Sequence, residues 1–284
     1  MTDENTISII MSCYNSEKTL KKAIDSILAQ TWKNWVMICC DDASADGTLE
    51  ILNAYHKQYP DKFVVLHNET NRKLPYSLNR CLSQVRTELV ARMDADDWCM
   101  PERLEKQVAF LKSHSQYDLV GTGVSVWDGE KTIASIVKIH EPTCQTMIRQ
   151  NAFSHATIMT YKRVYDVLGG YSEDPWAERV EDVDLWCRFL AAGFRGYNLP
   201  EKLYVILESV DAVKRRTLRA RLNSAVTRYR GYTLMGIRGW QRYRPFLNVL
   251  KAFVPTAVYR AIHLHSYKNR KKLVASEKST VSDS

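Results

Sequence analysis

Residues 89–97 read LVARMDADD, an apolar run that ends in a cluster of three aspartates. Residues 89–93 are typical of a buried β-strand, and Asp94, Asp96 and Asp97 follow it directly. Carboxylates beside a buried strand are costly unless a cation or the hydrogen-bond donors of a ligand compensate their charge. The pattern therefore predicts a strand whose carboxyl end carries a ligand-binding loop.

The chain on both sides of this stretch predicts an α/β fold. Apolar runs at residues 7–13, 35–40 and 63–67 predict further strands, and residues 17–30 and 48–59 have the periodicity or start signals of helices. Strands that alternate with helices indicate β-α-β units around a mainly parallel central sheet flanked by helices. Pro101 is expected to be the first residue of a helix that runs to about residue 114.

The second half of the chain is less regular and predicts a mixed sheet. Its expected strands are residues 119–127, 132–139 and 156–160, and its expected helices lie near residues 143–150 and 180–192. Beyond residue 211 the sequence is basic and mostly helical, with a polar tail after residue 272. We expect a catalytic domain over residues 1–210 and a basic C-terminal extension over residues 211–284.

Charge separates these two parts of the 284-residue chain. Residues 211–284 hold 17 Lys and Arg against 3 Asp and Glu, whereas residues 1–210 hold 23 against 29. The net charge is therefore +14 for residues 211–284 and −6 for residues 1–210. Such a basic extension is expected to bind an acidic partner, which could be nucleic acid, phosphates or an anionic membrane surface. No recognisable nucleic-acid-binding motif accompanies the charge, and a nucleic-acid partner is not expected.

Other classes of protein are disfavoured by simple patterns. The first apolar run is too short for a signal peptide and follows acidic residues. Residues 246–264 are interrupted by Lys251, Pro255 and Arg260, so a membrane-spanning helix is not expected. The seven cysteines are odd in number and form no C-x-x-C pair, which favours reduced thiols in the cytosol over disulfides or a zinc site.

Three polar clusters follow predicted strands, where open α/β sheets bind their ligands. They read SCYN at residues 12–15, DDAS at 41–44 and DADD at 94–97. Asp94 and Asp96 face the same side of an extended backbone, and their carboxylates suit a divalent cation such as Mg or Mn. The alternative is a solvated acidic turn that caps the following helix.

These clusters belong to an ordered series that resembles glycosyltransferase family 2. The series comprises SIIMSCYN at residues 8–15, SILAQT at 26–31, DDASADGT at 41–48, RMDADD at 92–97, PER at 101–103, FSH at 153–155, GGY at 169–171 and EDVDLW at 181–186. The resemblance covers roughly residues 6–208. It implies a GT-A fold, in which a nucleotide-binding half and an acceptor-binding half share one sheet.

The resemblance also implies roles for single residues on the donor side. Ser12, Tyr14 and Asn15 would line the pocket of a UDP-sugar, and Asp42 would bind the uracil edge. Asp94 would contact the donor ribose or sugar ring, Asp96 would bind the Mn or Mg ion on the diphosphate, and Asp97 would support the loop. The loop expected at residues 72–79 holds two further donor-binding candidates, Lys73 and Asn79, although relatives commonly have glycine where Lys73 stands.

On the acceptor side, Asp182 matches the catalytic base of an inverting transferase, with Glu181 beside it. The alternative is that these carboxylates only favour a helix N-terminus, where negative charge is stabilising. His155 is expected either near the diphosphate or metal or in a structural role. Arg188 is expected to pair with a carboxylate beside the base.

The resemblance further suggests a lipid-linked glycan acceptor. The sequence is similar to those of bacterial transferases that extend undecaprenyl-diphosphate sugars in O-antigen, lipopolysaccharide, capsule or exopolysaccharide synthesis. The basic extension would hold such an enzyme peripherally on the cytoplasmic face of the inner membrane, or would only pack on the catalytic domain. The rival interpretations are a sugar nucleotidyltransferase, disfavoured because the loop at residues 12–15 lacks glycine, and a noncatalytic membrane-associated scaffold.

Overall fold

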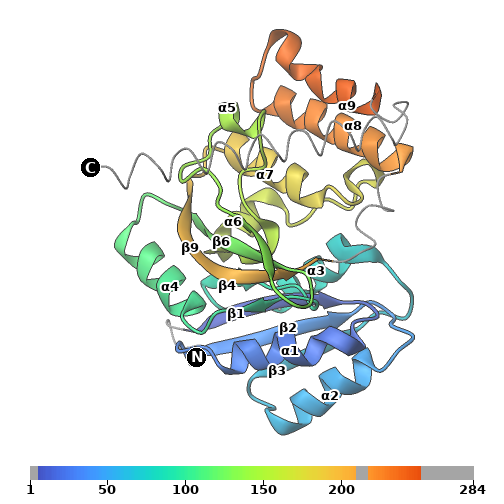
Figure 1. The fold of residues 1–284 in the computed structure, drawn as a ribbon, viewed down its shortest axis with the longest axis vertical. Helices are drawn as coiled ribbons and strands as arrows, with labels where there is room; N and C mark the ends of the chain where they lie inside the picture. The colour runs from blue at the N-terminus through green and yellow to red at the C-terminus, as the bar shows by residue number, and fades with distance from the viewer. Residues whose placement is uncertain (1–5, 209–216, 251–284) are drawn as a thin grey trace.

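A nine-stranded sheet runs through the protein in the computed structural model, which describes residues 6–208 and 217–250. Its order is β3-β2-β1-β4-β8-β6-β9-β5, and β7 pairs with β6 (Figure 1). The first four strands in the chain are parallel neighbours, as predicted: β1 (Ile7–Cys13), β2 (Trp35–Asp41), β3 (Phe63–His67) and β4 (Leu89–Arg92). Their carboxyl ends therefore meet at one edge.

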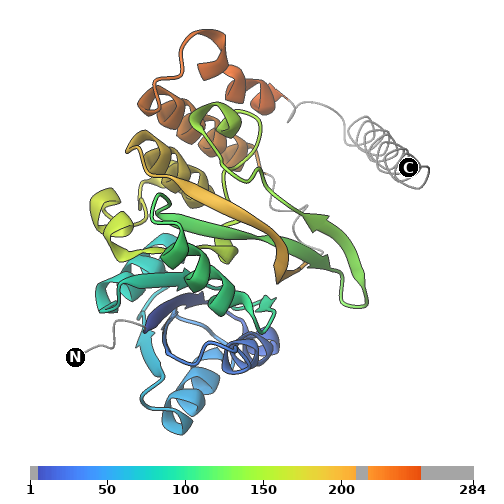
Figure 2. The ribbon, with the colours of Figure 1, turned by 90° about the vertical axis from the view of Figure 1, so that its left-hand side faces the viewer.

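The other half of the sheet contains both parallel and antiparallel strands, as the sequence predicts. It contains β5 (Trp98–Cys99), β6 (Leu119–Trp127), β7 (Thr132–Ile136), β8 (Met159–Tyr161) and β9 (Gly196–Leu207). β8 runs antiparallel to both β4 and β6, and β9 runs parallel to β6. The hairpin of β6 and β7 reaches away from the rest of the molecule (Figure 2).

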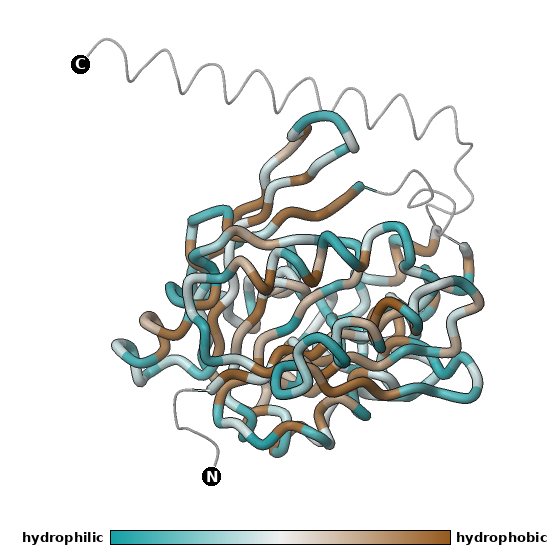
Figure 3. The backbone as a smooth tube through the Cα atoms, turned by 90° about the horizontal axis from the view of Figure 1, so that it is seen from below, coloured by the Kyte–Doolittle hydropathy of each residue, from teal (hydrophilic) through white to brown (hydrophobic). Residues whose placement is uncertain are grey.

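Helices cover both faces of this sheet. One apolar cluster joins it to α1 (Glu17–Leu28), α2 (Thr48–Gln58) and α4 (Arg103–Ser113); a second joins it to α3 (Lys73–Gln84), α6 (Lys162–Leu168) and α7 (Glu181–Ala191). Because side chains alternate along a strand, Ile7, Ile9 and Met11 enter the first cluster and Ile10 enters the second. Figure 3 shows the hydrophobic stretches gathered inside the fold.

The first helix of the basic extension packs against α7. This helix, α8 (Leu218–Leu234), is followed by short helical turns and α9 (Leu247–Leu250). Tyr232 is buried, and a Cβ atom added to Gly231 would clash with the side chain of Cys187. Glycine is therefore required for this close helix contact. Residues 251–284, with most of the apolar stretch at 246–264, lie outside the described residues.

Four local expectations were wrong. β7 ends at Ile136 and not at residue 139. Residues 73–84 form the helix α3 and not a loop, because the backbone at its start is bound by a side chain of a distant strand end. Residues 155–157 form a 3₁₀ turn before β8, so that strand is shorter than expected. The helix after the acidic cluster begins at Arg103 and not at Pro101, which lies in the turn before it.

In the part of the chain that the structure describes, no helix combines the length and the apolar composition needed to cross a bilayer.

Candidate active site

A cleft of about 900 Å³ opens at the carboxyl ends of β1, β2 and β4. The sheet side of the cleft contributes side chains from all three strand-end loops. The opposite side is formed by the start of α3, the segment before α7, and α8. The lining includes Ser12, Tyr14, Asp42, Lys73, Asp94, Asp96, Glu178, Arg179, Glu181, Arg221 and Ser224. The structure thus brings together seven of the residues proposed from the sequence.

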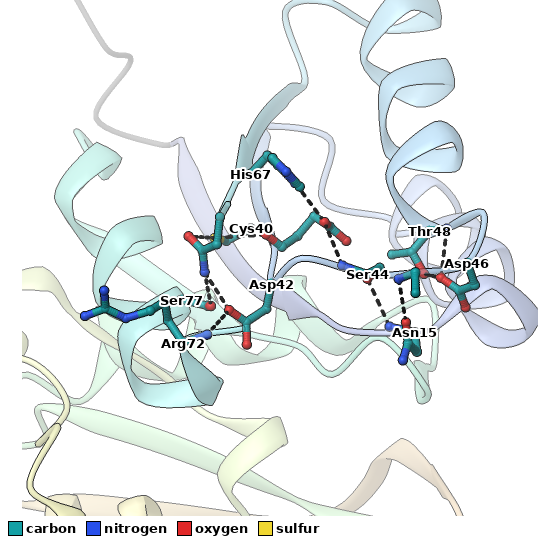
Figure 4. Close-up of polar contacts among 12 residues, drawn as sticks. Asn15, Cys40, Asp42, Ser44, Asp46, Thr48, His67, Arg72 and Ser77 are labelled. Atoms are coloured by element: carbon teal, nitrogen blue, oxygen red, sulfur yellow. Dashed lines mark hydrogen bonds and ion pairs between the residues drawn. The ribbon is translucent and has the colours of Figure 1, made fainter. Parts of the chain in front are cut away.

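Asp42 fixes the start of α3 within this cleft. Its buried carboxylate accepts hydrogen bonds from the backbone N–H groups of Arg72 (2.8 Å) and Lys73 (2.9 Å) and from the side chain of Asn68 (2.6 Å). Ser77 accepts a further bond from Asn68, as Figure 4 shows. A carboxylate has about four lone-pair positions, so Asp42 can still accept one donor from a ligand.

Replacing Asp42 with alanine is expected to destabilise the protein by about 2 to 4 kcal/mol, because two backbone donors at the start of α3 lose their acceptor. Asn68 keeps its bond to Ser77 in this variant. Urea unfolding measures the loss, and Ser77→Ala serves as the control because it leaves both backbone bonds intact. An Asp42→Ala midpoint equal to that of Ser77→Ala would contradict this role.

Asn15 joins the first two strand-end loops and does not line the cleft. Its backbone N–H donates to Ser44 Oγ at 3.0 Å, and its side-chain oxygen accepts from the N–H of Ala45 at 2.9 Å (Figure 4). Its φ of 49° is left-handed, a conformation that asparagine tolerates better than most residues. The half-exposed ring of neighbouring Tyr14 lines the cleft.

Contacts within the protein hold the carboxylates of Asp94 and Asp97 in the acidic loop. The buried guanidinium of Arg92 donates two hydrogen bonds, at 2.5 and 3.0 Å, to the carboxylate of Asp94. Asp97 is buried and accepts from the backbone N–H of Leu207 at 3.0 Å. Burial, followed by the charges of Asp94 and Asp96, raises the pKa of Asp97 to about 8. Asp97 thus ties this loop to β9.

The three carboxylates fit a divalent cation. Oxygen atoms of Asp94, Asp96 and Asp97 lie within 4.8 Å of one another, close enough to share one ion. Mg and Mn ions prefer such hard oxygen ligands, and their remaining coordination positions can be taken by phosphate oxygens. Asp96 is the exposed member of the group and lines the cleft, so it is the one best placed to meet a ligand there.

The start of α7 supplies the other pair of carboxylates. Glu181 lines the cleft, whereas Asp182 accepts a hydrogen bond from the side chain of Asn151 at 3.1 Å. Burial is the main cause that raises the pKa of Asp182, and the nearby charge of Arg228 opposes it. Burial, then the charge of Asp182, raises the pKa of Glu181 to about 7. Both groups therefore hold protons more tightly than ordinary carboxyls.

The raised pKa of Glu181 predicts a pH-dependent stability. In the unfolded chain this carboxyl titrates near 4.5, and in the folded protein near 7. The folded state binds more protons between these values, so stability falls as the pH rises through this window. Because the pKa of Asp97 is also raised, to about 8, Glu181→Gln is expected to reduce this slope in the thermal midpoint and not to abolish it. By contrast, Glu178→Gln, at a residue that also lines the cleft, is expected to keep the slope in full. Parallel curves for wild type and Glu181→Gln would refute this.

Three other residues proposed from the sequence lie away from the cleft lining. Asn79 exchanges two hydrogen bonds with the backbone of Tyr171, at 2.8 and 2.9 Å. His155 contacts the hydroxyl of Tyr171 at 2.9 Å; burial, then the charge of Arg92, lowers the pKa of His155. Arg188 pairs with Asp184 at 2.7 Å and donates to backbone carbonyls at the end of α6. Their observed contacts tie α3, α6 and α7 together.

Three arginines of the site were not among the residues expected from the sequence. Arg92 pairs with Asp94, and Arg179 and Arg221 line the cleft. The spacing of two between Arg92 and Asp94 was a usable signal, because such residues share one face of an extended strand. Arg221 comes from the extension and reaches the cleft only through the packing of α8. No local pattern identifies it.

Comparison with known proteins identifies the family and agrees with the fold. Residues 8–163 match the family described as Glycosyl transferase family 2. EpsE of Bacillus subtilis, named as a glycosyltransferase, is 41% identical over 268 residues, covering 94% of this chain and 96% of EpsE. The Erwinia amylovora amylovoran biosynthesis glycosyltransferase AmsE is 28% identical, covering 78% and 84%. The Escherichia coli UDP-Glc:alpha-D-GlcNAc-diphosphoundecaprenol beta-1,3-glucosyltransferase WfaP is also 28% identical, covering 75% and 82%.

Solved structures confirm the predicted GT-A architecture. Staphylococcus aureus TarS 1-349 in complex with UDP-GlcNAc superposes with a TM-score of 0.68 at 20% identity, covering 87% of this chain and 73% of that one. The mannosyltransferase PcManGT of Pyrobaculum calidifontis, solved with GDP-Man and Mn²⁺, gives 0.62 at 17% identity, covering 94% and 82%. The family match and the relation to EpsE together show that this chain belongs to glycosyltransferase family 2.

Proposed function

We propose that the protein is an inverting, metal-dependent transferase that moves a hexosyl group from a UDP-sugar to a hydroxyl of a lipid-linked glycan. The observation that carries the proposal is the cleft itself. Asp94, Asp96 and Glu181 line it, Asp97 is grouped with the first two, and Asp182 follows Glu181 at the start of α7. We also propose that residues 1–210 form the catalytic domain and that the C-terminal extension, residues 211–284, is an accessory part.

The donor would lie along the strand ends. Ser12 and Tyr14 line the part of the cleft nearest β1, and Asp42 retains one acceptor position for an N–H group of uracil. Asp94 is held by Arg92, which leaves its carboxylate oriented for a hydroxyl of the ribose or the sugar. Asp96 would hold the cation on the diphosphate, and Asp97 keeps the loop on β9. When bound, a divalent cation stabilises the negative charge that develops on departing UDP.

Asp182 would act as the base. The acceptor oxygen bonds to the anomeric carbon as the bond from that carbon to the diphosphate oxygen breaks, and the electron pair leaves with UDP. The proton of the acceptor hydroxyl passes to the Asp182 carboxylate, which Asn151 orients through its side-chain N–H. A single displacement of this kind inverts the anomeric carbon.

The names of the relatives support the acceptor and the cellular setting. AmsE is named for polysaccharide biosynthesis, and WfaP is named for transfer of glucose from UDP-Glc to a sugar on diphosphoundecaprenol. We propose that this protein likewise acts in bacterial surface polysaccharide synthesis, on the cytoplasmic face of the inner membrane.

Neutralising Lys268, Arg270, Lys271 and Lys272, which lie outside the described residues, is expected to abolish binding to anionic vesicles. Unchanged binding would contradict the peripheral placement.

A donor panel tests the proposal directly. The full chain is incubated with Mn or Mg, lipid-diphosphate sugars and a set of UDP-, GDP- and dTDP-linked sugars, and nucleotide release and product are recorded. We expect turnover of one UDP-sugar and its loss on chelation with EDTA. Turnover of a GDP-sugar instead would overturn the donor assignment. No turnover of any donor would favour the noncatalytic scaffold.

Lys73 gives a prediction for donor binding. Its φ of 73° is left-handed, which costs a non-glycine residue about 1 to 3 kcal/mol, and its side chain lines the cleft. A charge kept in such a strained position is expected to contact the donor phosphates. Lys73→Gly and Lys73→Asn both remove the charge and tolerate the conformation. Both are expected to raise the donor KM about 10- to 150-fold, because a hydrogen bond to a charged group contributes about 1.5 to 3 kcal/mol. An unchanged donor KM in steady-state assays would count against this contact.

A further inference from the structure

A second cavity, of about 460 Å³, lies beside the cleft and is lined by three arginines. Arg149 comes from the segment after α5 (Cys144–Met147), Arg228 comes from α8, and Arg244 comes from the helical turn at Arg244–Phe246. Within the described residues, no acidic side chain lines this arginine pocket. The pocket is polar and positively charged, and nothing in the proposed donor site uses it.

Within the described residues no carboxylate forms an ion pair with these arginines, although the charge of Arg228 acts on nearby Asp182. Arg228 donates one hydrogen bond, to the side-chain oxygen of Asn151 at 2.7 Å. Like charges gathered around one cavity repel one another unless an anion enters it. Guanidinium groups suit phosphate because their parallel N–H donors match its oxygens in pairs.

The arginine pocket adjoins the cleft and is linked to Asp182, the proposed base that receives the acceptor proton. Ser224 and Asn248 line both the arginine pocket and the cleft, so the two cavities are neighbours. A chain of hydrogen bonds runs from Arg228 through Asn151 to the carboxylate of Asp182. Two hydrogen bonds therefore link the arginine pocket to the proposed base.

Apolar side chains lie exposed beside the pocket. Leu247, which lines it, is 42% exposed, and Trp240, Tyr243 and Phe246, in the turns on either side of Arg244, are 66%, 43% and 37% exposed. Exposed aromatic and aliphatic side chains next to a basic cavity suit a ligand that has both an anionic group and a hydrocarbon chain. A free phosphate ion would use only the arginines.

We propose that the arginine pocket binds the diphosphate of the lipid-linked acceptor, with the lipid chain over the exposed apolar side chains and the acceptor sugar directed to Asp182. This inference rests on the proposed function, because it assigns the acceptor site of the same reaction. It adds a residue-level location for the diphosphate, and it explains why α8 and the turns after it pack onto the catalytic fold.

Matched acceptors test the pocket. One acceptor carries the sugar on a short-chain lipid diphosphate, and the other carries the same sugar on an uncharged alkyl chain. In the double variant Arg149→Gln/Arg244→Gln, we expect the KM of the diphosphate acceptor to rise at least about 10-fold, with the KM of the uncharged acceptor within about 2-fold of wild type. Arg238→Gln, an exposed arginine of the same region outside the pocket, is expected to change neither. Equal effects on both acceptors would overturn the assignment.

Two further measurements separate this inference from the proposed function. Titration with inorganic pyrophosphate in EDTA reports on the pocket without any transfer when every protein also carries Lys73→Gly, which removes the proposed donor-phosphate contact. We expect binding to the Lys73→Gly protein and to its Arg238→Gln derivative, and loss of binding in the double variant. Pyrophosphate binding that the double variant retains would overturn the inference, even if transfer is observed. Loss of binding to anionic phospholipid vesicles in the double variant, with an unchanged acceptor KM, would assign the pocket to a lipid headgroup and also overturn it. Failure of wild type to turn over any donor would reject the proposed function, and the pyrophosphate titration would still decide the pocket.

Discussion

Asp182→Asn is expected to lower kcat about 10²- to 10⁴-fold, the usual contribution of a general base, with donor KM within about 2-fold of wild type. The substitution keeps the size of the side chain and removes only its ability to accept the proton. Single-turnover assays with saturating donor and acceptor measure the effect. Because burial raises the pKa of Asp182, the wild-type rate should also fall at low pH from a higher pH than an ordinary aspartate would give.

Two neighbouring carboxylates provide the controls. Asp184→Asn removes the same charge from the first turn of α7, but Asp184 pairs with Arg188 away from the cleft lining, so kcat should change little. Glu181→Gln removes the carboxylate that lines the cleft. A large loss in Glu181→Gln together with a nearly normal Asp182→Asn would transfer the role of base to Glu181.

Asp96→Asn is expected to lower kcat/KM about 10²- to 10³-fold at a fixed Mn concentration, because a lost metal ligand removes several kcal/mol of transition-state stabilisation. The protein should remain as stable as wild type without metal, since Asp96 is exposed. Rates measured against Mn concentration, together with the metal-induced rise in thermal midpoint, give the two readouts. Wild-type metal dependence in Asp96→Asn would contradict its role as the ligand.

Asp94→Asn is expected to act mainly on stability, in contrast to Asp96→Asn. It leaves the buried guanidinium of Arg92 without its charged partner, which is expected to cost about 3 to 5 kcal/mol of stability. Asp94→Asn should therefore lower the unfolding midpoint, whereas Asp96→Asn should lower metal dependence. The pair separates the aspartate that holds Arg92 from the aspartate proposed to bind the metal.

Much of the fold was readable from the sequence because it depends on local patterns. The apolar runs that form β1 to β4 are short, rich in β-branched residues and separated by helical periodicity, and they lie within one residue of their predicted ends. α3 was not predicted, because its start is fixed by Asp42, about thirty residues earlier. β9 was not predicted either. It contains Asn198, Pro200 and Glu201, and its pairing with β6, including two register shifts, determines its course.

The candidate site was predictable only in part, for the same reason. The strand-end position of the acidic cluster placed Asp94 and Asp96 in one cleft with Asp42. The sequence could not show that Arg92 already compensates Asp94, or that Asn15 and Asn79 bind neighbouring loops. It also could not bring α8 to the cleft. Contacts between distant segments determine each of these, and no local spacing encodes them.

The stereochemistry of the product tests the central claim most directly. The full chain is incubated with Mn, the α-linked UDP-sugar that it turns over and a lipid-diphosphate acceptor, and the new glycosidic linkage is examined by NMR. A single displacement between the Asp94–Asp97 loop and Asp182 predicts a β-linked product, formed by wild type and lost in Asp182→Asn. An α-linked product would contradict it.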